Sequence, residues 1–117
     1  MRKLIVLIAA LALLAPVTAS ASTIGQSNAA RSAQNYIQTM PFSYKSLIEQ
    51  LQYEGYSRSD AVYGASHSGA NWMREAVLSA RNYLQTMPFS RSDLIGQLQY
   101  EGFTPAQARY GVSVAYR

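Results

Sequence analysis

The chain carries nearly the same sequence twice, with an offset of 47 residues. When residues 32–66 are aligned with residues 79–113, 22 of the 35 positions are identical. A fixed period of this length indicates one small supersecondary unit that is used twice. The fold can therefore be derived from a single repeat, and every residue retained in both copies requires a reason in packing or in function.

The first 21 residues are expected to be a secretory signal peptide. Two basic residues are followed by Leu4–Val17, which is uncharged and mostly apolar, and Ala19 and Ala21 occupy the small-residue positions of a cleavage site. Fourteen helical residues rise about 21 Å, less than the roughly 30 Å hydrocarbon core of a bilayer. Cleavage is predicted near Ala21–Ser22, which would leave a secreted or envelope-associated protein. The alternative is that this segment is not cleaved and serves as an N-terminal membrane anchor. If it is cleaved, no stable membrane anchor is expected.

Apolar residues with helical spacing predict that the first helix of each repeat buries one face. The predicted stripe consists of Ala29, Ala30, Ala33, Ile37 and Met40 in the first copy, and of Met73, Val77, Ala80, Leu84 and Met87 in the second. Pro41 and Pro88 follow the stripes directly. Because the residue before a proline is pushed out of the α region, each first helix is predicted to end there.

Two more helices are predicted in each repeat from their caps. The expected N-caps are Ser43, Ser57, Ser90 and Thr104, and the expected C-terminal stops are Gly55 and Gly102. Period-two alternation, which would indicate strands, is absent from the sequence. The sequence therefore predicts an all-α fold of two tandem three-helix, helix-turn-helix-like modules: module 1 (residues 22–68) and module 2 (residues 69–117).

Composition excludes several classes of function. The sequence has no cysteine, so disulfides, thiol catalysis and cysteine-based metal sites are excluded, as is a lipidated cysteine after the signal. Without the first 21 residues, eight basic and six acidic residues leave a net charge of +2. Nucleic-acid binding normally requires Lys and Arg gathered on one face, so a nucleic-acid partner is not expected.

No catalytic constellation is visible. His67 is the only histidine, and it has no counterpart in the second copy, where Val114 stands. Asp60 and Asp93 are explained as helix-capping residues, and no pair of carboxylates lies in a clearly apolar setting that would favour acid–base catalysis. We expect a protein that is not an enzyme and that has no cofactor, no metal site and no catalytic residues.

Tyrosine is the residue type that suggests binding, with nine copies, all after residue 21. Tyr53 and Tyr100 are predicted to project away from the core side of the second helix, and Tyr63 and Tyr110 away from that of the third. Tyrosine offers a large, rigid ring with a polar tip, which suits protein interfaces. The candidate partner-binding residues are Tyr53, Tyr100, Tyr63, Tyr110, Gln52 and Gln99; packing on a neighbouring helix is the alternative for the rings.

One further aromatic residue is predicted to join the two modules. Trp72 has no counterpart in the first copy, where Gly25 stands. Each module has only about 45 residues, a size at which a lone apolar core is marginal. Trp72 is therefore interpreted as an inter-repeat packing residue.

An ordered string of residues in the second copy, largely present in the first, resembles a known repeat. It consists of Asn71-Trp72, Ala76, Ala80-Arg81-Asn82-Tyr83-Leu84, Phe89-Ser90-Arg91, Leu94-Ile95, Gln97-Leu98, Gly102-Phe103-Thr104-Pro105, Gln107-Ala108 and Tyr110. This string resembles the repeat of the Ltp-like host cell surface-exposed lipoproteins. The resemblance implies a surface-displayed module and, by the characterised branch of that family, superinfection exclusion of phage by hindering DNA entry.

Three functions follow as hypotheses. The first is an exported, non-enzymatic binding protein of the cell envelope whose partner is a phage or envelope protein. The second is a secreted structural or interaction module with no role against phage. The third, based on the helix-turn-helix shape, is DNA binding, for which the third helices offer few basic side chains.

Overall fold

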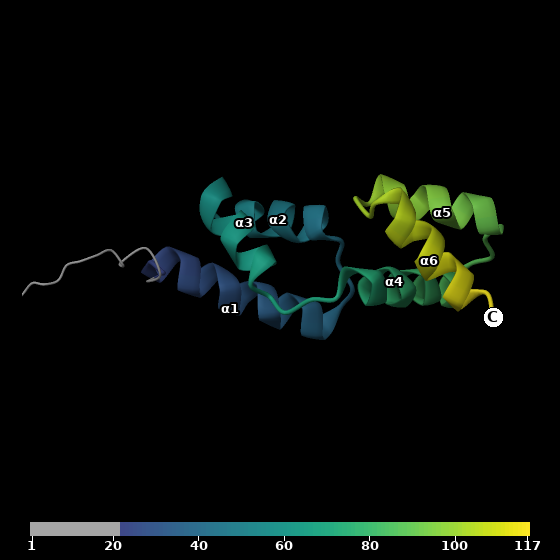
Figure 1. Cartoon of the computed structure of the whole chain (residues 1–117), viewed down its shortest axis with the longest axis horizontal. Helices are drawn as coiled ribbons and strands as arrows, with labels where there is room; N and C mark the ends of the chain where they lie inside the picture. The colour runs from purple at the N-terminus through teal and green to yellow at the C-terminus, as the bar shows by residue number, and fades with distance from the viewer. Residues whose placement is uncertain (1–21) are drawn as a thin grey trace, which may run out of the picture.

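The computed structural model describes residues 22–117, so the predicted signal peptide lies outside the described residues. All regular structure in this part of the chain is helical. The helices are α1 (Ile24–Thr39), α2 (Tyr44–Tyr53), α3 (Arg58–Ser66), α4 (Trp72–Thr86), α5 (Arg91–Tyr100) and α6 (Pro105–Ala115). They form two three-helix modules placed end to end (Figure 1). The predicted all-α fold with two tandem three-helix repeats is confirmed.

The helix boundaries follow the local signals of the sequence. Before the prolines, the backbone becomes extended, with φ of −159° at Met40 and −162° at Met87. The Ser43 hydroxyl accepts from the Ser46 N–H at 3.0 Å, and the Ser46 hydroxyl accepts from the Ser43 N–H at 2.9 Å. This reciprocal pair satisfies two backbone donors that the start of α2 would otherwise leave free.

The predicted caps at the other boundaries are confirmed as well. The side chains of Ser57, Ser90 and Thr104 each accept a hydrogen bond from a backbone N–H three residues on. Gly55 and Gly102 follow α2 and α5 with φ of 105° and 107°. Because side chains disfavour this left-handed region, glycine is the residue expected at both helix ends.

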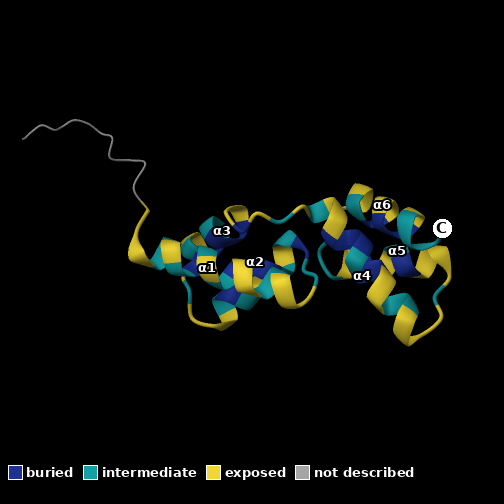
Figure 2. Cartoon of the chain, turned by 90° about the horizontal axis from the view of Figure 1, so that it is seen from below, coloured by how far each residue is buried: buried dark blue, intermediate teal, exposed yellow. Residues whose placement is uncertain are grey.

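Within each module the third helix crosses the first at very close range. A Cβ placed on Gly64 of α3 would lie 2.7 Å from the carbonyl carbon of Ala29 in α1. The same crossing recurs in module 2, where a Cβ on Gly111 of α6 would lie 2.6 Å from the carbonyl carbon of Ala76 in α4. In Figures 1 and 2, α3 and α6 lie on the same side of the molecule. The close approach of glycine to alanine determines where α3 packs on α1 and where α6 packs on α4.

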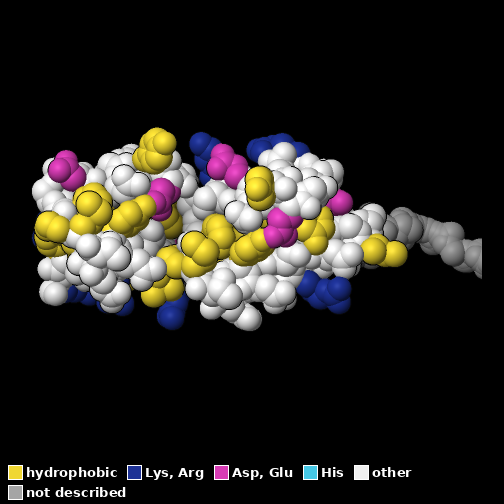
Figure 3. Space-filling view, turned by 180° about the vertical axis from the view of Figure 1, so that it is seen from behind, with side chains coloured by type: hydrophobic (Ala, Val, Ile, Leu, Met, Phe, Trp, Pro, Cys, Tyr) yellow, Lys and Arg dark blue, Asp and Glu magenta, His cyan; other side chains and the backbone are white. Residues whose placement is uncertain are grey.

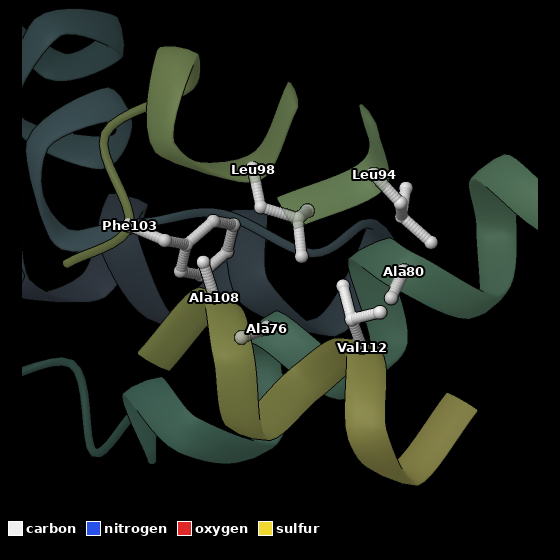
Figure 4. Packing of buried hydrophobic residues seen from close by; sticks show 7 residues of the cluster. All are labelled: Ala76, Ala80, Leu94, Leu98, Phe103, Ala108 and Val112. Carbon is white, nitrogen blue, oxygen red and sulfur yellow. The ribbon is translucent and has the colours of Figure 1, made fainter. Parts of the chain in front are cut away.

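Each module has its own apolar core (Figure 2). In module 1 the core consists of Ala33, Leu47, Ile48, Leu51, Ala61 and Ala65. In module 2 it consists of Ala76, Ala80, Leu94, Leu98, Phe103, Ala108 and Val112, which converge from α4, α5 and α6 and the turn before α6 (Figure 4). The leucines of the second helices are fully buried in both cores.

The methionines assigned to the buried stripe are a wrong prediction. Met40, Met73 and Met87 are 55%, 40% and 53% exposed. Met40 and Met87 fall at the C-caps, where the backbone has already left the helix, so helical periodicity no longer describes them. Met73 lies in the first turn of α4. The alanines of the stripe, by contrast, are fully buried at Ala29, Ala33 and Ala80 and half-buried at Ala30.

Few contacts join the modules, and they concentrate at the start of α2. Trp72 packs against the core cluster of module 1, and its ring meets that of Tyr44 edge-on at 5.5 Å between centroids. The Phe42 N–H donates to Glu75 Oε1 at 3.0 Å, and the Ser43 hydroxyl donates to the Glu101 carbonyl at 2.7 Å. The joint thus combines one aromatic contact with two hydrogen bonds.

The contact between the modules buries the carboxylate of Glu75. Glu75 is 5% exposed, and burial raises its pKa above the ordinary value of 4.5, although the hydrogen bond from Phe42 and the charge of Arg74 oppose this shift. The folded protein therefore holds this proton more tightly than the unfolded chain. The corresponding stabilisation is complete below pH 4.5 and is lost as the pH rises through the higher folded-state pKa.

We therefore expect Glu75→Gln to raise the melting temperature at pH 7, with a difference from the unaltered protein that disappears below pH 4.5. Glutamine removes the desolvated charge and keeps an oxygen that can accept from Phe42. Melting curves from pH 3 to pH 8 measure this, with the exposed Glu49→Gln as the control. The raised pKa of Glu75 would be contradicted if the melting temperature of Glu75→Gln, compared with that of the unaltered protein, were lower at pH 7 than at pH 4.

Candidate functional site

The most exposed repeated aromatic residues are the last residues of α2 and α5. Tyr53 is 87% exposed and Tyr100 is 85% exposed, although both are identical in the two repeats. Packing within this chain therefore does not explain why tyrosine occupies this position in both repeats. Large rings held in water at equivalent positions are suited to contact with a protein partner.

The other candidate partner-binding residues lie in more mixed surroundings. Tyr63 is half-buried and stacks on His67 at 3.8 Å between ring centroids, whereas Tyr110 is 45% exposed. Gln52 is half-buried and accepts from Arg58 at 3.1 Å; Gln99 is exposed. Their assignment as binding residues stays a prediction.

A second repeated feature is a shallow depression between the first helix and the turn after the second helix. In module 1 it has a volume of about 280 Å³ and is lined by Ser32, Asn35, Tyr36, Thr39 and Glu54. In module 2 it has a volume of about 270 Å³ and is lined by the repeat-equivalent Ser79, Asn82, Tyr83, Thr86 and Glu101. We call each of these depressions a polar hollow. Met40 and Pro41 of module 1 form an additional wall of the hollow in module 2.

The tyrosine of each polar hollow is held in the same way. Tyr36 meets Phe42 edge-on at 5.5 Å, and its hydroxyl accepts from Gln50 Nε2 at 3.3 Å. In module 2, Tyr83 meets Phe89 at 5.4 Å and accepts from Gln97 Nε2 at 3.2 Å. Because the hydroxyl oxygen already accepts from glutamine, its proton remains available for a ligand.

The carboxylates of the two polar hollows differ in their surroundings. Glu54 is exposed, whereas Glu101 is half-buried beside the joint between the modules. Burial raises the pKa of Glu101, and a long hydrogen bond of 3.4 Å from the Ser79 hydroxyl opposes the shift. In module 1 the equivalent Ser32 instead bonds the Tyr56 hydroxyl at 2.9 Å, because Tyr56 stands where module 2 has Phe103.

The surface between the first and third helices, by contrast, differs between the modules. A hollow of about 370 Å³ between α4 and α6 carries Arg74 and Arg81, whose counterparts in module 1 are Ser27 and Gln34. In the view of Figure 3, hydrophobic side chains form a row along both modules, with Asp and Glu beside it and Lys and Arg towards the edges. Within residues 22–117, no group of three His, Asp or Glu side chains is placed to hold a metal ion.

Comparison with known proteins places the chain in a family. A family model described as host cell surface-exposed lipoprotein matches residues 25–67 and 71–114, which correspond to the two modules. The chain belongs to this family of host cell surface-exposed lipoproteins. The resemblance seen in the sequence is thereby confirmed. A comparison with curated proteins gives no significant match.

A solved structure is also similar to this family member. It is the structure of Ltp, a superinfection exclusion protein from the Streptococcus thermophilus temperate phage TP-J34. The two chains are 26% identical and superpose with a TM-score of 0.75, over 80% of this chain and 97% of that one. Among the described residues, no helix combines the length and the apolar character needed to cross a membrane.

Sequence reasoning missed the polar hollows, although a signal was available. Asn35 and Asn82 were considered as polar contacts beside the tyrosines, but not together with Thr39 and Glu54, which are also polar and identical in the other copy. Their convergence depends on the turn after α2 folding back beside α1, which only the structure shows. Sequence reasoning also missed Gly64 and Gly111, which are identical in both copies and lie inside a helix.

Proposed function

We propose that this chain is a non-enzymatic binding protein displayed at the cell surface, where it acts in superinfection exclusion. Membership in the family supports surface display, and the similarity to the TP-J34 protein supports a role against phage. The mechanism is occupancy: the protein engages a phage or envelope protein and thereby hinders infection, without a chemical step on its partner.

The observation that carries this proposal is the pair of exposed rings at Tyr53 and Tyr100. An unpaired tyrosine ring in water contributes little to the fold, so its presence at the same place in both modules favours a role in contact. Two equivalent contacts on one chain also raise the overall affinity for a partner that can engage both at once. This supports binding through both modules over a purely structural role.

DNA binding receives less support than surface contact. The Arg58 side chain at the start of α3 bonds Gln52 within the same module. Its counterpart in module 2 is Pro105, so the two third helices do not present a common basic side chain at this position. A helix that reads the major groove usually combines base-edge contacts with several phosphate contacts.

We expect the double substitution Tyr53→Ser and Tyr100→Ser to leave the melting temperature nearly unchanged and to abolish protection against phage. Each exposed ring contributes within about ±0.5 kcal/mol to folding, whereas a ring at the centre of an interface contributes about 2 kcal/mol or more to binding. The measurement is the efficiency of plating on cells that express the full chain, together with thermal unfolding of the purified protein.

The matched control is Gln38→Ser with Gln85→Ser, a pair that is also exposed and identical in the two modules. Protection that survives loss of both tyrosines would remove them as the contact site. If the unaltered protein does not lower the efficiency of plating of any phage that infects the host, the role in exclusion is contradicted. That outcome would favour a secreted interaction module without a phage role.

A further inference from the structure

The two polar hollows are more alike than the repeats that contain them. The five lining positions that the two hollows share are identical between the modules, whereas 13 of the 35 aligned positions differ. The surroundings, in contrast, have changed: the hollow in module 2 abuts module 1, and the hollow in module 1 does not. Side chains that stay the same while their neighbours change require an explanation other than packing against those neighbours.

Intramolecular bonds account for only part of the set. The Thr39 and Thr86 hydroxyls donate to the backbone carbonyls of Tyr36 and Tyr83 at 2.9 and 3.0 Å. Asn35 and Asn82, however, are exposed, and within residues 22–117 neither side chain makes a hydrogen bond. An asparagine in mid-helix is a poor helix former, so its presence in both copies is not explained by helix stability.

The free hydrogen-bonding groups define the ligand chemistry. Each hollow offers the tyrosine O–H and the asparagine NH₂ as donors. It offers the asparagine carbonyl, the threonine oxygen and the carboxylate as acceptors. In module 2 the Glu101 carboxylate already accepts long hydrogen bonds from Ser79 Oγ and Gln97 Nε2, both at 3.4 Å, and keeps further lone pairs for a ligand. A purely cationic ligand would use the acceptors and leave the donors unmatched, and an anion would face the carboxylate. A neutral ligand rich in hydroxyl and amide groups uses both.

The apolar parts of the hollow narrow the ligand further. The tyrosine ring is half-buried and forms one side, and in module 2 the Met40 side chain and Pro41 form another. A volume of about 270 Å³ is sufficient for one sugar ring rather than a larger ligand. An acetamido group combines an amide, which can pair with asparagine, and a methyl, which can lie against the apolar wall.

We propose that each polar hollow binds one N-acetylated hexosamine unit of a glycan chain, so that the protein holds the glycan at two equivalent sites. Asn82, Tyr83 and Glu101 bond the sugar hydroxyl and amide groups in module 2, as Asn35, Tyr36 and Glu54 do in module 1. The hollow in module 2 is the stronger site because Met40 and Pro41 cover the acetamido methyl. This binding site is separate from the exposed tyrosines of the proposed function and does not depend on them.

The test is a titration of isotope-labelled protein, residues 22–117, with chitotetraose, followed by ¹H–¹⁵N NMR. We expect the side-chain NH₂ signals of Asn35 and Asn82 to shift, with saturation at lower concentration for Asn82. Cellotetraose, which lacks the acetamido groups, should bind about tenfold more weakly, since one lost hydrogen bond and one lost methyl contact correspond to roughly this factor.

Paired substitutions identify the site. Asn35→Ala with Asn82→Ala should remove the shifts of neighbouring backbone signals, whereas Gln38→Ala with Gln85→Ala, on the same two helices, should keep them. Met40→Ala should weaken binding to module 2 alone. Backbone signals of residues outside the hollows should stay unchanged in each variant, which shows that the variant is folded.

Two results would overturn the proposal. One is the absence of any shift at either asparagine with chitotetraose at 20 mM, about twenty times the dissociation constant of a weak, 1 mM site. The other is a response of both hollows to a trilysine peptide but not to chitotetraose, which would make them cation sites. Protection against phage is measured separately, so loss of glycan binding with protection intact would leave the proposed function standing.

Discussion

Leu98→Ala is expected to lower the free energy of unfolding by about 2–5 kcal/mol. Leu98 is fully buried and belongs to the core cluster of module 2, where it lies among side chains from α4 and α6 (Figure 4). Alanine removes three carbon atoms and leaves a cavity that the surrounding helices fill only in part. Leu51→Ala in module 1 should have a similar effect, because Leu51 is fully buried at the equivalent position.

Chemical denaturation monitored by circular dichroism measures both losses. Because few contacts join the modules, Leu98→Ala should shift the unfolding of module 2 more than that of module 1, and Leu51→Ala should do the reverse. The exposed Tyr100→Ser, two residues after Leu98, is the matched control and should change stability by no more than about 0.5 kcal/mol. A loss below about 1 kcal/mol for both leucine variants would show that the cores collapse around the cavity or that the leucines lie elsewhere.

The fold was predictable because the boundary signals are local and occur twice. Proline after α1 and α4, serine or threonine before the other four helices, and glycine after α2 and α5 each act within a few residues. Different residues give the same boundary, as with Ser57 in one copy and Thr104 in the other. Such signals do not depend on the tertiary structure, so they can be recognised in a single sequence.

The joint between the modules was predictable only in part. Trp72 stood out because it interrupts the repeat, but its contacts with Tyr44 and the core of module 1 required the structure. Glu75 gave no signal, since its counterpart is Asn28 and its partner is a backbone N–H of the other module. A hydrogen bond between a side chain and a distant backbone group leaves no pattern in the sequence.

Of the candidate site, the exposure of Tyr53 and Tyr100 followed from helical geometry, because both lie opposite the buried leucines of a short helix. The polar hollows did not follow, because they combine residues from α1 or α4 with one residue from a turn at least 15 positions further along the chain. Their chemistry was present in the repeat, but their proximity is set by how the second helix returns beside the first.

Gly111→Ala is expected to destabilise module 2 by about 1–3 kcal/mol, although alanine normally stabilises a helix. The added Cβ would lie 2.6 Å from the carbonyl carbon and 2.7 Å from the carbonyl oxygen of Ala76, both of which belong to the backbone of α4. Backbone atoms cannot move aside as a flexible side chain can, so α6 must shift away from α4 and loosen the core between them.

Gly96→Ala supplies the matched control, since Gly96 is exposed inside α5 and a Cβ there would meet nothing within 4 Å. The same substitution should therefore stabilise the protein at residue 96, by up to about 1 kcal/mol, and destabilise it at residue 111. Thermal unfolding of the two variants measures this opposition of sign, and a Gly111→Ala protein as stable as the Gly96→Ala protein would show that α6 does not cross α4 at this glycine.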